Sequence, residues 1–276
     1  LPKAQLGVIY GASGSGKSFV ALDLAMSIAR GEPWRGRRVT RMPVAYVIAE
    51  GSAGFKKRVE AYAMRHGVKP AEVPIHGLAA APNLGEPNDV KELIKGLQAI
   101  GGVGLVVIDT LAQVTPGADE NTAKDMSPVL SALQALAIDL DLVFLVVAHT
   151  GKDAERGLRG WSGLLANADG LIMMSAADEG QRSGTVEKVK DGMAGDRFGF
   201  ELDVVEIGQD EDGDTITTCI VQDTETPGQN RVSRKLLPKL ELVMRCLQMC
   251  IDAGQFANVP AVGGVPVGTK GVPRDV

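Results

Sequence analysis

A glycine-rich octapeptide lies near the start of the chain: Gly11-Ala12-Ser13-Gly14-Ser15-Gly16-Lys17-Ser18. It follows an apolar run at residues 6–10 and precedes a helical pattern that begins near Lys17. Glycines let the backbone curl so that successive N–H groups point at one anion, and the positive end of the following helix adds to the attraction. A Gly/Ser-rich turn is the alternative. All eight positions fit G-x-x-x-x-G-K-S between a strand and a helix, so the sequence predicts a phosphate-binding P-loop.

The residues of this loop have separate predicted roles. Lys17 is expected to reach the β- and γ-phosphates of a nucleotide, and the Ser18 hydroxyl is expected to hold Mg²⁺. ATP and Mg²⁺ are therefore the expected cofactors. The expected nucleotide contacts run along the loop into the helix: Gly11, Ala12, Ser13, Gly14, Ser15, Gly16, Lys17, Ser18 and Phe19.

The composition is that of a globular protein. The chain has 276 residues, of which 45% are hydrophobic and 23% charged, so it can form one large α/β domain with an appendage. The formal net charge of -5 does not indicate a nucleic-acid-binding protein, and any such surface must be local. Three cysteines form no disulfide framework, which fits a reducing compartment such as the cytoplasm. No run approaches the roughly 20 apolar residues of a membrane span.

Strand and helix patterns alternate through the first half of the chain. Helices are predicted at residues 19–30 and 55–66, after a cap at Asn88 or Asp89, and from a Ser127-Pro128 cap to about residue 140. Between them lie three apolar runs typical of strands buried on both faces, at residues 44–49, 105–108 and 142–148. This order predicts an α/β fold with a mainly parallel central sheet and helices on both faces.

After His149 the pattern changes to successive short strands. Turn signals at Asp191-Gly192 and Asp212-Gly213 separate them, so an antiparallel extension of the sheet is expected. The core domain is predicted to end near residue 235. A C-terminal helix follows at residues 236–253, and residues 254–276 are rich in Gly and Pro, as in a tail or linker.

Polar residues end several of the apolar strands. Asp109 follows one of them and is placed as a Walker B aspartate, which holds Mg²⁺ beside the P-loop. Many P-loop ATPases have Glu directly after this Asp, whereas this chain has Thr110. Glu50 and His149 each end another of the apolar strands, and such residues converge at the ligand edge of a parallel sheet. Glu50 could polarise water, or simply cap a loop. His149 could contact the γ-phosphate, or be a satisfied edge histidine.

Two loops carry basic residues. Residues 31–42 contain Arg35, Arg37, Arg38 and Arg41, and a solvated loop is favoured over a phosphate-binding patch. The second loop, at residues 151–164, joins cations to an aromatic ring. Its side chains could hold a single-stranded backbone and stack a base. The candidate DNA-binding residues are Lys152, Arg156, Arg159 and Trp161.

Together these motifs resemble the RecA-type ATPase core, and in particular the RepA-like branch of plasmid and phage hexameric replicative helicases. The resemblance rests on Ala49-Glu50, Val107-Ile108-Asp109-Thr110-Leu111, Ala148-His149-Thr150-Gly151-Lys152 and Arg159-Gly160-Trp161-Ser162. It implies a homo-oligomeric ring, with ATP at subunit interfaces and single-stranded DNA in the channel. It also implies that Glu50 is the catalytic carboxylate and His149 the phosphate sensor.

The resemblance assigns Lys188 and Lys190 as fingers that reach the γ-phosphate in a neighbouring subunit. Helicases similar to DnaB have K-x-R at this place, whereas this chain has K-x-K. Surface strand lysines are common, so a simple solvated pair is the alternative. A trans-acting cation at this place would act as an arginine finger does.

Three functions follow as hypotheses. The first is a Mg²⁺-dependent ATPase that unwinds DNA as a ring-shaped helicase in plasmid or phage replication. The second is a RecA-like recombination or strand-annealing ATPase. The third is a nucleotide-binding regulatory protein that hydrolyses ATP poorly.

Overall fold

The computed structural model describes residues 5–119, 122–149, 167–177, 180–225, 257–258 and 270–271. The chain divides into two compact units, Leu1–Pro227 and Gly228–Val276. In the second unit, strands β10 (Ala257–Asn258) and β11 (Lys270–Gly271) pair antiparallel. The helix predicted at 236–253 and most of the predicted tail lie outside the described residues, so the predicted domain limits stay predictions.

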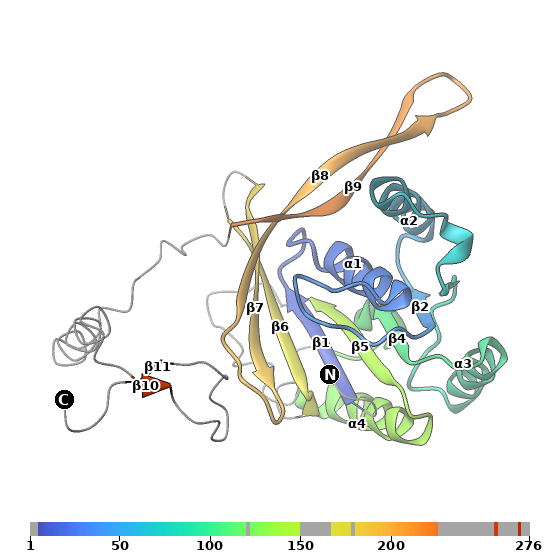
Figure 1. The fold of residues 1–276 in the computed structure, drawn as a ribbon. Helices are drawn as coiled ribbons and strands as arrows, with labels where there is room; N and C mark the ends of the chain where they lie inside the picture. Colours follow the sequence, from blue (N-terminus) through green and yellow to red (C-terminus); the bar gives the residue numbers. More distant parts are fainter. Residues whose placement is uncertain are drawn as a thin grey trace. The chain divides into compact units, whose positions relative to one another are not determined.

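The first unit is built on a nine-stranded sheet (Figure 1). Its order is β3-β2-β4-β5-β1-β6-β7-β8-β9. The first six strands in this order are parallel: β3 (Ile75–Leu78), β2 (Val44–Ile48), β4 (Leu105–Asp109), β5 (Val143–His149), β1 (Gln5–Gly11) and β6 (Gly170–Ala176). The last three are antiparallel: β7 (Arg182–Val189), β8 (Arg197–Gln209) and β9 (Thr215–Thr224). The predicted fold class is confirmed, including the antiparallel extension.

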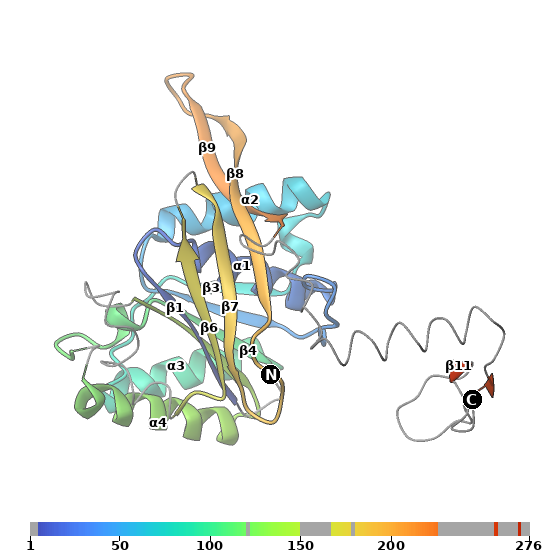
Figure 2. The same ribbon diagram turned by 90° about the vertical axis from the view of Figure 1, so that its left-hand side faces the viewer.

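Helices cover both faces of the parallel strands. Helices α1 (Lys17–Arg30) and α2 (Ser52–His66) pack on one face, and α3 (Pro87–Ile100) and α4 (Ala123–Asp139) on the other (Figures 1 and 2). Two short 3₁₀ helices, η1 (Pro70–Glu72) and η2 (Leu111–Val114), follow α2 and β4. No helix among the described residues is long and apolar enough to cross a membrane.

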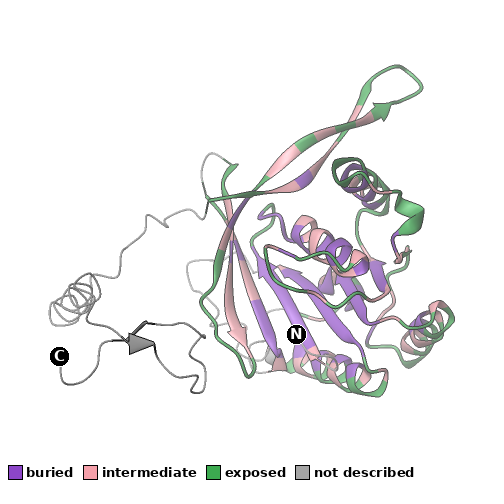
Figure 3. Ribbon diagram, in the orientation of Figure 1, coloured by how far each residue is buried: buried purple, intermediate pink, exposed green. Residues whose placement is uncertain are grey.

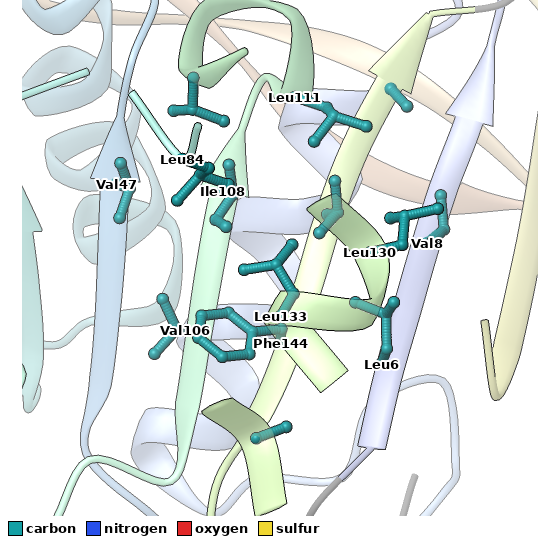
Figure 4. Close-up of a cluster of buried hydrophobic side chains, with 14 of the residues drawn as sticks. Leu6, Val8, Val47, Leu84, Val106, Ile108, Leu111, Leu130, Leu133 and Phe144 are labelled. Atoms are coloured by element: carbon teal, nitrogen blue, oxygen red, sulfur yellow. The ribbon is translucent and has the colours of Figure 1, made fainter. Parts of the chain in front are cut away.

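The strands are buried on both faces because their side chains alternate between two cores. In β4, Val106 and Ile108 point into the core under α3 and α4, which also contains Leu130 and Leu133 (Figure 4). The intervening Val107 belongs to the core under α1. Figure 3 shows this burial concentrated in the central strands. The continuous apolar runs of the sequence are therefore explained by a sheet between two helical layers.

Two predicted helix starts are wrong. Helix α4 begins at Ala123 rather than after Ser127, because the Thr122 side chain accepts a hydrogen bond from the Asp125 amide at 3.4 Å. Pro128 therefore lies inside the helix. Helix α3 begins with Pro87 in its first turn and Glu86 at the cap, ahead of the predicted Asn88 or Asp89. Proline suits the first turn because its fixed φ matches a helix and its missing N–H would be unpaired there.

Strands β8 and β9 form a two-stranded ribbon. Strand β8 pairs with β7 only over Arg197–Phe200, and then continues beyond the carboxyl ends of the parallel strands while paired with β9. The ribbon contacts α1 and α2 and then extends past α2 (Figures 1 and 2). This extension carries the ribbon over the edge of the sheet where the P-loop lies.

Candidate active site

The glycine-rich loop connects β1 to α1. Gly14 and Gly16 have φ angles of +78° and +88°, which L side chains rarely adopt. A Cβ at Gly16 would also lie 2.9 Å from a ring carbon of Phe200 in β8. Glycine is therefore required at position 16 both for its backbone conformation and for the close packing of the loop against β8.

Lys17 is buried at the start of α1. Its Nζ donates hydrogen bonds to the carbonyls of Gly11 at 3.0 Å and Ala12 at 2.7 Å. The ammonium group is thus held across the mouth of the loop, where a phosphate would lie close to it. The loop hydroxyl of Ser15 is buried and has no hydrogen-bond partner within the described part of the chain.

Asp109 ends β4 beside the loop. Its two carboxylate oxygens accept hydrogen bonds from the Ser18 hydroxyl at 2.9 Å and the Tyr46 hydroxyl at 2.8 Å. Burial raises the pKa of Asp109, while these two hydrogen bonds act in the opposite direction. The peptide bond between Asp109 and Thr110 is cis. The two predicted metal ligands, Ser18 and Asp109, thus lie side by side in the structure, and their role in holding Mg²⁺ stays a prediction.

These groups fit a magnesium ion. A hydroxyl and a carboxylate are the hard oxygen ligands that Mg²⁺ takes from protein, with water and phosphate oxygens completing its shell. Among the described residues, no group of three or more His, Cys, Asp and Glu side chains could hold a metal alone. The buried Thr110 hydroxyl, which borders the same space, has no hydrogen-bond partner in the described chain. A bound nucleotide with its metal would supply hydrogen-bond partners for both the Ser15 and the Thr110 hydroxyls.

Glu50 and His149 come to the same edge from β2 and β5, the two strands that flank β4. Ile48 is paired with Asp109, and Glu50 follows it by two residues as an exposed side chain. His149 is paired with Gly11, the first residue of the P-loop. Burial, followed by the charge of Lys17, lowers the pKa of His149, which favours the neutral imidazole. The convergence that the strand ends predict is thus observed.

One cavity of about 260 Å³ joins these residues. Its lining combines the P-loop with the ends of the neighbouring strands: Ser13, Gly14, Gly16, Lys17, Ser18, Phe19, Glu50, Gly51, Arg58, Asp109, Thr110, His149 and Leu202. A larger cavity of about 620 Å³ lies against α2 and η1, away from these groups. We place the active site in the smaller cavity because the polar groups converge there.

Arg58 of α2 is a member of the site that the sequence did not indicate. Its guanidinium lies 4.4 Å from the centre of the Phe19 ring, and its charge acts on Asp109. The only signal in the sequence is a basic residue eight positions after Glu50. Arg58 lies in helix α2, which begins at Ser52. Its place in the site depends on how this helix packs on α1, which the local sequence does not show.

Lys188 and Lys190 do not approach the P-loop of their own chain. Strand β7 is antiparallel to β6, so Lys188 pairs with Leu171 at the opposite end of the sheet from Gly11. Lys190 Nζ lies 3.0 Å from the buried carboxylate of Asp169, and the hydrogen bond to this carboxylate raises the pKa of Lys190. Their assignment to a neighbouring subunit's site stays a prediction. Lys152, Arg156, Arg159 and Trp161 lie outside the described residues.

The prediction of a solvated basic loop at residues 31–42 is wrong for Arg35. Its guanidinium forms a 2.7 Å ion pair with Asp223 and lies 4.4 Å from the centre of the Phe198 ring. The neighbouring Trp34 donates to Asp23 at 2.8 Å. The ion-pair partner of Arg35 and its nearest aromatic ring both belong to the ribbon, which is distant in sequence. Arg37, Arg38 and Arg41 are exposed, as expected.

The sheet order, the P-loop and the carboxylate at the end of β4 define a RecA-like P-loop ATPase. The chain belongs to the AAA domain family, whose model matches residues 1–155. Its fold is similar to the crystal structure of the RadB recombinase, with a TM-score of 0.55, 19% identity, and coverage of 73% of this chain and 89% of that one. It is also similar to a second solved structure, described as an ATPase domain, with a TM-score of 0.54, 15% identity, and coverage of 78% of this chain and 85% of that one.

Proposed function

We propose that this protein is a Mg²⁺-dependent ATPase that unwinds DNA as a ring-shaped replicative helicase of the RepA-like type. One observation carries the proposal. Glu50, Asp109 and His149 line a single cavity with the P-loop, although they come from the ends of three different strands. Because Thr110 occupies the place directly after Asp109, we assign hydrolysis to Glu50, the other carboxylate among the described residues that line this cavity. This arrangement favours turnover over simple nucleotide binding.

The roles of the residues follow from their chemistry. Ser18 and Asp109 hold the metal, and Lys17 exchanges its loop carbonyls for phosphate oxygens. When bound, Mg²⁺ neutralises charge on the transferring phosphate. Glu50 accepts a proton from the attacking water as a general base. His149 donates a hydrogen bond to the γ-phosphate. When hydrolysis removes this phosphate, the change at His149 is transmitted to the loop that follows β5.

The remaining parts of the proposal involve other molecules. Lys188 and Lys190 of one subunit complete the phosphate site of the next, in a ring that is expected to be hexameric. Lys190 would exchange its ion pair with Asp169 for this role. Lys152, Arg156 and Arg159 hold the backbone of single-stranded DNA, and Trp161 stacks on a base.

Replacing Glu50 with Gln tests the proposal. The amide keeps the size and polarity of the side chain but cannot accept the proton from water, so ATP turnover is expected to fall by about 10²- to 10⁴-fold. Nucleotide affinity should change little, since Glu50 is not needed to hold phosphate. Glu60→Gln, an exposed residue of α2, is the matched control. Unchanged turnover in the Glu50 variant would remove Glu50 from its proposed role.

A recombination or strand-annealing ATPase is the second candidate, favoured by the fold similarity to a protein named as the RadB recombinase. Strand displacement separates the two. A helicase releases the labelled strand of a forked duplex when ATP is hydrolysed, and the Glu50→Gln variant does not. Annealing of complementary strands without displacement would support the second candidate instead.

A further inference from the structure

The outer part of the β8–β9 ribbon, residues 204–216, is strongly acidic and is called the ribbon tip here. Residues 201–225 include nine Asp and Glu and no Lys, Arg or His. Figures 1 and 2 both show the tip extending beyond α2. The charge of the chain is thus very uneven, because the whole protein has a net charge of only -5. The rest of the chain must therefore be net positive.

The ribbon tip has features of a surface that is covered in the assembled protein. A two-stranded hairpin alone is marginally stable in water and needs a third strand or a packed helix. The inner part of the ribbon has this support, since Asp203 pairs with Arg65 of α2 at 3.0 Å. In the tip, Val204 is 63% exposed, and Ile207 and Ile216 are only partly buried. These apolar side chains lie among carboxylates, so a partner should be both apolar and basic.

A groove with this chemistry lies at the other end of the sheet of the same chain. It encloses about 340 Å³ between the loop at residues 31–42 and strands β1, β5, β6 and β7. Its floor is apolar, with Val143, Leu145 and Ile172 from the face of the sheet that α1 covers. Arg37 and Arg38 line it as exposed side chains. We call this feature the basic groove. Arg37 also pairs with Asp196, which leaves Arg38 as the more available cation.

The two features lie at opposite edges of the sheet. The ribbon tip continues β8 beyond the carboxyl edge, past Leu202, which lines the nucleotide cavity. The basic groove is lined by Gly7, Gly170 and Lys188 near the amino edge. The ribbon tip therefore cannot reach the basic groove of its own chain by a small movement. When copies stack head to tail, the carboxyl edge of one faces the amino edge of the next.

We propose that the ribbon tip of one copy docks in the basic groove of the next copy. The apolar side chains of the tip enter the apolar floor, and its carboxylates meet Arg38 and Arg37 at the mouth. The contact is heterologous, so it generates a ring if it closes and a filament if it does not. It rests on the self-association that the proposed function requires, and it places Lys188 of the receiving copy at the same interface.

The partner is a second copy rather than nucleic acid. Phosphate groups would be repelled by the ribbon tip, which has no cation to receive them. The apolar floor of the basic groove also offers no favourable contact to a charged phosphate backbone. Complementary charge at such an interface fixes its register and accelerates encounter, and it weakens as salt rises.

Charge reversal in two separate variants tests the contact. Glu206→Lys with Glu211→Lys makes the tip less acidic, and Arg38→Glu with Thr40→Glu makes the groove acidic; all four side chains are exposed. Each variant alone should self-associate at least about tenfold more weakly by sedimentation equilibrium. A mixture of the two should associate again, because each altered tip finds an altered groove and each natural tip finds a natural groove.

The matched control reverses two exposed acids, Glu92→Lys and Asp139→Lys, on the helices that cover the other face. It should associate as the natural protein does. Failure of the mixture to recover, or natural association in either single variant, would overturn the contact while leaving the proposed ATPase intact. A natural protein that remains monomeric with an ATP analogue at every concentration would count against both the contact and the ring.

Discussion

At the scale of single residues, the site depends on how each polar group is held. Asp109 is surrounded by two hydroxyl donors, which keep its carboxylate oriented in a buried place. Lys17 is tied to the loop carbonyls rather than left mobile. Pre-oriented groups lower the entropy that binding must overcome. A nucleotide would therefore meet a nearly complete set of partners from one chain.

Arg58 provides the residue-scale prediction. If its guanidinium supports the charge of the phosphates across the cavity, Arg58→Ala should lower ATP turnover by about 10²- to 10³-fold, as the loss of one preorganised donor does in other active sites. Arg58→Lys should recover part of the loss, because it keeps the charge but not the planar group that stacks on Phe19. Steady-state ATPase rates measure both. Lys57→Ala, an exposed neighbour on α2, is the control, and an equal loss there would indicate a general effect on the helix.

At the scale of elements, the ribbon and the loop at residues 31–42 hold each other in place. Arg35 contacts both Phe198 and Asp223, and the rings of Trp34 and Phe198 form a T-shaped pair with centroids 5.5 Å apart. Trp34 also donates a hydrogen bond to Asp23 of α1. Helix α1, whose first turn holds the phosphate, is thus linked to the ribbon through one aromatic cluster. Nucleotide binding and the position of the ribbon are coupled if this cluster moves as a unit.

Asp23 gives a prediction for this cluster. Burial raises the pKa of Asp23 to about 6, above its ordinary value of 3.8. The folded state therefore holds a proton in this pH window that the unfolded state has lost, and stability falls as pH rises from 4 to 6. Asp23→Asn removes this cost and can still accept from Trp34. Its stability relative to the natural protein should increase by about 2 kcal/mol between pH 4 and 7.

Urea unfolding at several pH values measures this difference. Asp139→Asn, an exposed carboxyl at the end of α4, is the control. A relative stability of the Asp23 variant that does not change with pH would show that this carboxyl titrates alike in the folded and unfolded chain.

At the scale of the whole molecule, charge is segregated. The acidic ribbon lies beside the nucleotide edge, whereas the groove at the opposite edge is lined by cations. Any contact with DNA, as proposed above, would therefore come from a local basic segment and not from the general field of the protein. The loop at residues 151–164 follows directly from His149, so a phosphate sensor and a DNA contact would be adjacent in the chain.

Salt dependence tests this proposed DNA contact. If Lys152, Arg156 and Arg159 each neutralise one phosphate, the affinity for single-stranded DNA should fall with salt, with a log–log slope of about -2. Replacing any one of them with Ala should reduce the slope by about 0.7. Fluorescence titration of a labelled oligonucleotide measures both. Glu206→Lys, in the acidic ribbon tip, is the control. Its affinity for single-stranded DNA should depend on salt at least as steeply as that of the natural protein. A slope near zero would exclude a backbone contact of this kind.

Much of the fold and the site could be predicted from residues close together in the chain. The P-loop is specified by eight consecutive residues, and the alternation of buried strands with amphipathic helices is sufficient to indicate the parallel sheet. Parallel strands also end at the same edge, which is why Glu50, Asp109 and His149 could be grouped before their contacts were known. Helix starts were less accurate, because Thr122 and Ser127 are both good caps and only packing chooses between them.

Tertiary structure alone decided the rest, because the partners are far apart in sequence. The sequence does not show that Arg58 stacks on Phe19, or that Arg35 packs against a ribbon 160 residues or more away. The direction of β7 places Lys188 and Lys190 far from their own phosphate loop, and only strand pairing reveals it. Local chemistry in the sequence thus determined where a phosphate binds. The packing of α2 and of the ribbon decided which other charges surround it.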